Sequence, residues 1–189
     1  MLLISNTGGF SLGDRTRKIA LTGIISALVV ISLILESIAP TGRLGFYVLA
    51  AFMLSVVLIE SGIGWGWASY IVTCAVGFLL VPEKLNLLPY IMFFGIYTLL
   101  KFHIESISKP WIEFILKLGA FNLFLWPAWK IAGTFLPAYL TEGTGVLIGG
   151  IVLQIVFVFY DFLFTCWIRY YNEKIAPRIR KNKPKIPID

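Results

Sequence analysis

The chain has 189 residues, of which 58% are hydrophobic and only 14% are charged, and its mean hydropathy is +0.86. Soluble domains are about a quarter charged, so this composition excludes an ordinary soluble domain and predicts an integral membrane protein. The net charge is +6, but the basic residues gather near the two ends. Such clusters beside apolar runs indicate contact with anionic lipid and argue against a nucleic-acid partner.

Six apolar runs follow one another along the chain, and they are continuous rather than alternating. Because backbone groups in lipid must be satisfied internally, such runs favour helices over a closed barrel. The predicted transmembrane helices cover approximately 19–35, 44–59, 65–81, 87–100, 111–136 and 146–167. The second and fourth are short for a hydrocarbon core about 30 Å thick. Between the second and third, Gly62, Gly64 and Gly66 predict a tight turn or a close helix crossing.

The sequence therefore predicts an all-α integral membrane protein, a compact bundle of six transmembrane helices with an outward-facing cavity. It is expected to be a single domain over 1–189, with about 19–167 embedded and with basic flanks at 1–18 and 168–189. An even number of spans places both termini on one side. The positive-inside rule assigns that side to the cytoplasm, because the only basic residues in the loops of the opposite side are Arg43 and Lys84.

Several signatures of catalysis are absent from the sequence. It has no HExxH pair and no phosphate-binding loop. The single histidine, His103, is interpreted as a solvated residue of a cytoplasmic turn. Cys74 and Cys166 lie within apolar runs, where we expect small buried hydrophobes rather than metal ligands. The sequence thus predicts no enzyme activity, no catalytic residue, no metal and no cofactor.

Small residues line one face of the first predicted helix. Thr22 and Ser26 are four residues apart, as are Gly23 and Ala27. Small side chains let another helix approach closely in lipid. Two interpretations follow: docking onto a separate membrane protein, or packing inside this bundle.

A polar set lies in the predicted outer half of the fifth helix. Asn122, Trp126, Trp129 and Lys130 recur at spacings of three and four, so they share one helix face. A lysine inside a spanning helix is expensive unless it faces a partner or a wet cavity. The alternative is that Lys130 reaches the outer surface, with the two tryptophans forming an interfacial belt.

Further polar residues are expected on the same side of the membrane. Glu36, Arg43 and Tyr47 surround the first external turn, Asn86 follows the third helix, and Gln154 lies near the middle of the sixth. Together with the fifth-helix set they predict a pocket with aromatic walls and a few charged anchors. In the sixth helix, Asp161 is expected to form a structural ion pair with Lys117 or Lys101, the alternative being a proton relay.

This pattern resembles the substrate-binding S components of energy-coupling factor (ECF) vitamin transporters. The resemblance rests on the basic start RTRKIALTGIISALVVI, the short second helix after a Pro/Gly turn, and the basic tail, and it covers roughly residues 15–183. The family commonly carries Ala-x-x-x-Ala in its first helix for docking on the coupling subunit. Here the corresponding positions are Gly23 and Ala27, or Thr22 and Ser26.

The resemblance implies a function. The chain would bind a vitamin or related micronutrient from outside, beneath a gate at 37–43, and deliver it through a transmembrane coupling subunit with two ATPase subunits. It would be a multi-pass protein of a prokaryotic plasma membrane, in contact with membrane lipids. Lys130 and Arg43 would favour an anionic or zwitterionic ligand. The alternative is a non-transporting scaffold resembling the cell-shape protein family of envelope assembly.

Overall fold

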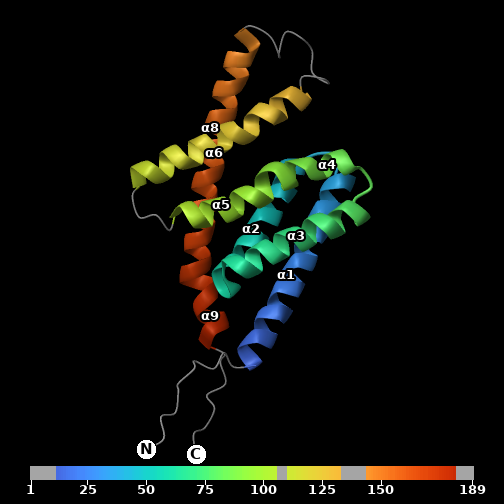
Figure 1. Ribbon diagram of the computed structural model, residues 1–189, viewed down its shortest axis with the longest axis vertical. Coiled ribbons are helices and arrows are strands. Elements are labelled where there is room, and N and C mark those ends of the chain that lie inside the picture. Colours follow the sequence, from blue (N-terminus) through green and yellow to red (C-terminus); the bar gives the residue numbers. More distant parts are fainter. Residues whose placement is uncertain (1–11, 106–109, 133–143, 182–189) are drawn as a thin grey trace, which may run out of the picture. The chain divides into compact units, whose positions relative to one another are not determined.

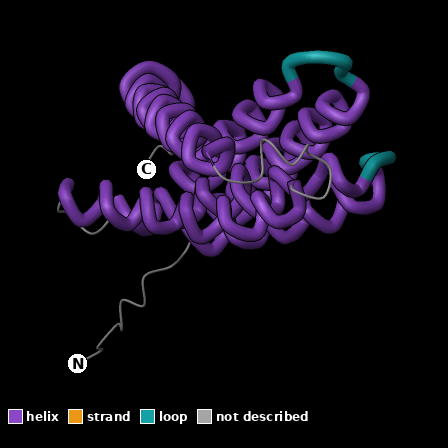
Figure 2. The backbone as a smooth tube through the Cα atoms, turned by 90° about the horizontal axis from the view of Figure 1, so that it is seen from above, coloured by secondary structure: helices purple, strands orange, loops and turns teal. Residues whose placement is uncertain are grey.

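A computed structural model describes residues 12–105, 110–132 and 144–181, and within these ranges all regular secondary structure is helical (Figure 1). Figure 2 shows the described residues as helices, with short loops between some of them. The chain divides into two units, Met1–Ser106 and Ile107–Asp189, each of which is described by itself. The predicted all-α class is confirmed, whereas the single domain stays a prediction.

The helices follow the predicted order. In the first unit they are α1 (Leu12–Ile38), α2 (Arg43–Ser61), α3 (Ile63–Leu80), α4 (Lys84–Pro89), the π-helix η1 (Tyr90–Phe94) and α5 (Gly95–Ile104). In the second unit they are α6 (Pro110–Ala132), α8 (Thr144–Tyr170), the π-helix η3 (Tyr171–Ile175) and α9 (Ala176–Lys181).

Five helices of the described part are long and apolar enough to cross a membrane. They are Gly13–Ile38, Arg43–Ser61, Ile63–Leu80, Lys84–Ile104 and Gly145–Arg178. The helix α6 occupies the range expected for the remaining span as far as Ala132. A multi-pass membrane protein is therefore supported by length and composition, and the number six stays a prediction.

The second and fourth spans are not short, contrary to the sequence-based expectation. They have 19 and 21 residues, because the helices continue through polar end residues such as Glu60, Lys84 and Lys101. Likewise α1 begins before the apolar run and carries the exposed Arg15 and Arg17 on its first turns. Hydropathy marks the apolar part of a helix, whereas the helix itself ends where its backbone bonding ends.

The fourth span contains a proline that the sequence analysis did not use. Pro89 stands inside the continuous helix Lys84–Ile104, and the wider π-turn Tyr90–Phe94 follows it directly. Proline removes a backbone donor, and π-turns are a usual response to such an interruption. The hydroxyl of Tyr70 on α3 donates to the carbonyl of Ile91 at 2.7 Å, which ties α3 to this irregular turn.

The core of the first unit lies where α1, α2, α3 and α5 contact one another (Figure 1). Its fully buried side chains include Leu33, Leu54, Leu58, Tyr90 and Tyr97. Large hydrophobic residues on the opposite faces, such as Phe78 and Leu79, are exposed. Such exposure is unfavourable in water and expected in lipid, which agrees with the membrane assignment.

Both predictions for the glycine-rich stretch after α2 are confirmed. Gly62 alone separates α2 from α3, with φ of 96°, and its N–H donates to the carbonyl of Leu58 at 3.0 Å. This left-handed backbone favours glycine. Gly66, one turn into α3, is buried against α2: a Cβ there would lie 2.3 Å from Cδ2 of Leu58. The tight turn and the close crossing together set α3 against α2.

We expect Gly66→Ala to lower the free energy of unfolding by about 1–3 kcal/mol, the usual penalty of overpacking. The added methyl group would displace the buried Leu58 and press on Leu99. Thermal melting in detergent measures this, with Gly64→Ala as the matched control, because a Cβ at Gly64 meets nothing within 4 Å. Equal melting of the two variants would contradict the close crossing.

Candidate functional site

A buried carboxylate stands near the end of α1. Glu36 is only 1% exposed, although charged side chains are rarely fully buried. Residues 39–42 form the turn that follows, with Gly42 in the left-handed region at φ of 76°, and α2 begins at Arg43. This short turn brings Arg43 back over the end of α1, where its Nε lies 3.9 Å from Oε1 of Glu36.

Two further residues join α2 and α4 to this point. Tyr47 lies one turn beyond Arg43 on α2, and its hydroxyl donates to the backbone carbonyl of Asn86 and interacts with the Glu36 carboxylate. The Asn86 side chain in turn donates to Oε2 of Glu83 at 3.3 Å. We call Glu36, Arg43, Tyr47 and Asn86 the Glu36 cluster. All four belong to the predicted pocket, and the structure brings them into one group.

The cluster holds charge in an apolar surrounding. The separation of 3.9 Å between Arg43 and Glu36 makes an ion pair but exceeds hydrogen-bond distance. In the described part of the chain, Oε1 of Glu36 is buried and has no hydrogen-bond partner. Leaving such an oxygen unsatisfied costs about 1–3 kcal/mol, and more when the group is charged. The arrangement is suited to accepting a further N–H or O–H donor.

The second unit holds the other described members of the predicted pocket. Nε2 of Gln154 on α8 donates to Oδ1 of Asn122 on α6 at 2.8 Å. Nearby the rings of Phe121 and Phe157 stack with centroids 4.3 Å apart. Trp126 is 70% exposed. The pairing of Asn122 with Gln154 gives α6 and α8 a polar contact beside the stacked aromatic rings.

The side chains of Trp129 and Lys130 lie outside the described part of the chain, although the α6 backbone extends through both residues. Their proposed role as ligand anchors therefore stays a prediction.

The expected ion pair of Asp161 is confirmed with Lys117 as its partner. Nζ of Lys117 on α6 lies 3.4 Å from Oδ2 of Asp161 on α8. Lys101, the other candidate, instead contacts Glu105 at 2.8 Å, four residues along the chain. Ion pairs of this kind chiefly keep two helices in register. Removing one partner is destabilising, because it leaves the other charge without compensation.

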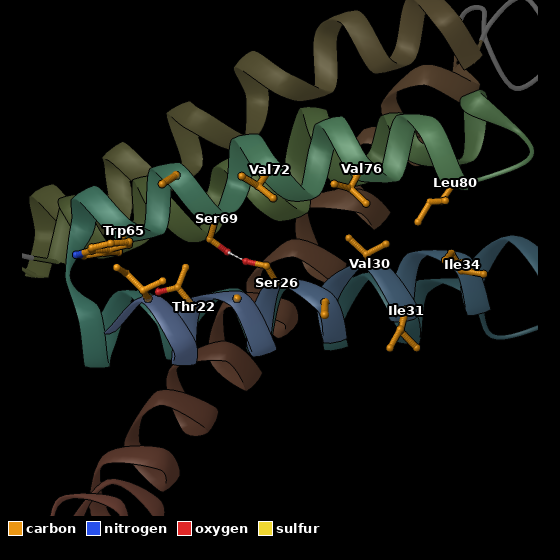
Figure 3. Close-up of a pocket in the computed structure, with 14 residues that line it drawn as sticks. Thr22, Ser26, Val30, Ile31, Ile34, Trp65, Ser69, Val72, Val76 and Leu80 are labelled. Atoms are coloured by element: carbon orange, nitrogen blue, oxygen red, sulfur yellow. Dashed lines mark hydrogen bonds between the residues drawn. The ribbon is translucent and has the colours of Figure 1, made fainter. Parts of the chain in front are cut away.

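A groove of about 570 Å³ runs between α1 and α3 (Figure 3). Its walls are apolar, and its floor carries the hydroxyls of Ser26 and Ser69, whose oxygens lie 2.7 Å apart. Thr22 donates to Ser61 on α2 at 3.5 Å. Figure 3 shows the bond between Ser26 and Ser69 bridging the two helices.

The four small residues on this face of α1 fall into a buried pair and an exposed pair. Thr22 and Ser26 are buried and bond to α2 and α3, as the internal-packing interpretation expects. Gly23 and Ala27 are exposed and line the groove. A docking role for this face stays a prediction, and the residues free to meet a partner are Gly23 and Ala27.

The sequence analysis did not single out Ser61, Ser69 or Glu83. The two serines bracket the glycines of the stretch SGIGWGWAS, and small polar residues in spanning helices commonly bond across a helix contact. That signal was available. Glu83 gave no comparable signal, because its pairing with Asn86 depends on the turn before α4.

Comparison with known proteins adds no relative: no family model, no curated protein and no solved structure matches the chain.

We expect Tyr47→Phe to lower the free energy of unfolding by about 1–3 kcal/mol, since it leaves the part-buried Asn86 carbonyl without its donor and removes the hydroxyl that interacts with Glu36. Tyr170→Phe is the matched control, because Tyr170 is exposed. Melting curves of both variants test this. A Tyr47→Phe protein as stable as the wild type would contradict the bridging role of the hydroxyl.

Proposed function

We propose that the chain is the substrate-specific membrane subunit of an ATP-driven importer of the ECF type. It binds a vitamin or a related small micronutrient from outside the cell and delivers it through partner subunits. It spans the plasma membrane of a prokaryotic cell with both termini in the cytoplasm. The Glu36 cluster is the observation that supports this proposal most.

Ionisable residues inside membrane-spanning helices are expensive and usually functional. Glu36 belongs to a helix that is long and apolar enough to span, yet it is almost fully buried and incompletely paired. A purely structural role would favour a satisfied pair or an apolar residue at this point. Binding a polar solute explains why such a carboxylate is kept.

The turn above the cluster fits the proposed gate at 37–43. Its central residues Pro40, Thr41 and Gly42 are exposed, and Nε of Arg43 donates to the Ala39 carbonyl at 3.2 Å, which ties its two ends together. With the N-terminus in the cytoplasm, α1 crosses the membrane once and delivers this turn to the outer surface. A solute arriving from outside then meets the gate first.

The remaining proposed ligand residues lie in the second unit. Their proposed part in binding rests on the sequence alone: Asn122 and Gln154 carry amide groups, and Trp126, Trp129 and Lys130 carry aromatic surface and positive charge. Sites for small molecules generally combine apolar walls with a few polar anchors of this kind. The sequence has no phosphate-binding loop, so partner subunits hydrolyse ATP.

We expect the protein purified from its own cells to carry a small molecule that mass spectrometry detects after denaturation. Adding that molecule back should raise the melting temperature, because a ligand that binds only the folded state stabilises it. Absence of any bound molecule, together with unchanged melting across a panel of vitamins, would contradict the proposal. That outcome would favour the membrane scaffold.

The α1–α3 groove supports the proposed docking on a transmembrane coupling subunit. Its exposed Gly23 and Ala27 leave room for a partner helix to approach α1 closely.

We expect the combined change Gly23→Leu and Ala27→Leu to abolish association with the coupling subunit and its ATPases while leaving ligand binding intact, because leucine side chains would fill the groove. Affinity purification of the complex measures this. Ala20→Leu is the matched control, since Ala20 is exposed on the same helix and does not line the groove. If the double variant still assembles, the groove is not the interface.

A further inference from the structure

We infer that Glu36 binds a protonated nitrogen of the substrate, so the substrate is a cationic or zwitterionic nitrogen compound rather than a purely anionic one. The inference rests on the proposed function and assigns the chemistry of one end of its site.

The first step is the missing donor. Oε1 of Glu36 is buried and unbonded in the described part of the chain, and the whole side chain is 1% exposed. A buried polar atom normally has a partner, so one without it indicates a group still to arrive. A carboxylate oxygen accepts hydrogen bonds only, so that group must be a donor.

Arg43 does not supply the donor. Its Nε donates to the carbonyl of Ala39 at 3.2 Å and lies 3.9 Å from the carboxylate. Its side chain is 47% exposed, so much of the guanidinium charge is directed to the surroundings of the turn. Arg43 thus covers Glu36 without satisfying it.

Tyr47 cannot satisfy the carboxylate fully either. A tyrosine hydroxyl has one proton, and that of Tyr47 faces two acceptors, the Asn86 carbonyl and the Glu36 carboxylate. It donates to the carbonyl. The side-chain amide of Asn86 is also engaged, because it donates to Glu83.

The charge balance points the same way. The ionised groups that act on Glu36 are Arg43, which is positive, and Glu83, which is negative. With Glu36 itself the group carries one more negative than positive charge. In a low-dielectric site an arriving cation gains from that excess, whereas an anion is repelled. A protonated amine or an amidine-like nitrogen meets both requirements, charge and donor.

The test uses the full-length protein purified from its own cells as wild type, Glu36→Gln and Glu173→Gln, with bound small molecules identified and quantified by mass spectrometry. Glutamine keeps the shape of glutamate and removes its charge. Glu173→Gln is the matched control, because Glu173 is exposed and is not among the charged groups that act on Glu36. Size-exclusion profiles establish that each variant is folded.

We expect the wild-type ligand to contain a protonated nitrogen. Its occupancy should fall roughly tenfold or more in Glu36→Gln, as for loss of a charged hydrogen bond, and stay near wild type in Glu173→Gln. A ligand without such a nitrogen, or full occupancy in a folded Glu36→Gln protein, would overturn the inference and leave the proposed function standing. No ligand in the wild type would overturn both. If Glu36→Gln does not fold, the wild-type ligand alone tests the inference, which then stands or falls on whether that ligand contains such a nitrogen.

Discussion

Satisfying polar groups away from water is the constraint on which the rest of this structure depends. The backbone N–H and C=O groups bond to one another within the helices, and polar side chains likewise bond to partners inside the protein. In the first unit Ser26 bonds Ser69, and Thr73 on α3 lies 2.9 Å from the hydroxyl of Tyr90. Tyr70 reaches the carbonyl of Ile91 in the π-turn. Each contact joins two helices, so polar satisfaction and helix packing are achieved by the same residues.

Glu36 differs from those helix-joining residues, because its buried Oε1 has no hydrogen-bond partner in the described part of the chain. Its position in the fold shows what this difference means. It stands where α1, the turn after it and the start of α2 meet, with α4 attached through Tyr47 and Asn86. The surrounding helices are held by satisfied bonds, so the carboxylate is kept in place by a rigid frame. Sites that bind solutes need such preorganised groups, because ordering them at the moment of binding would reduce affinity.

Much of the helical fold was predictable, because lipid-facing helices are recognisable in a sequence as continuous apolar runs. The prediction for Gly62 and Gly66 succeeded because small residues have few uses other than turns and close crossings. Helix ends were misjudged at Lys84 and Lys101, since hydropathy does not register polar residues that remain helical. The grouping of Glu36, Arg43 and Asn86 was predicted from their shared side of the membrane, but the pairing of Lys101 with Glu105 was not. Side-chain partners depend on helix rotation and turn length, which a single sequence specifies only weakly.

The central claim is that the turn above Glu36 faces the outside of the cell and admits a solute. Thr41 is exposed in that turn, and Cys74 and Cys166 can be replaced by alanine to give a cysteine-free background. In that background we expect Thr41→Cys to react with a membrane-impermeant maleimide added to intact cells. Reaction only after the membrane is made permeable would place the turn in the cytoplasm and contradict the account.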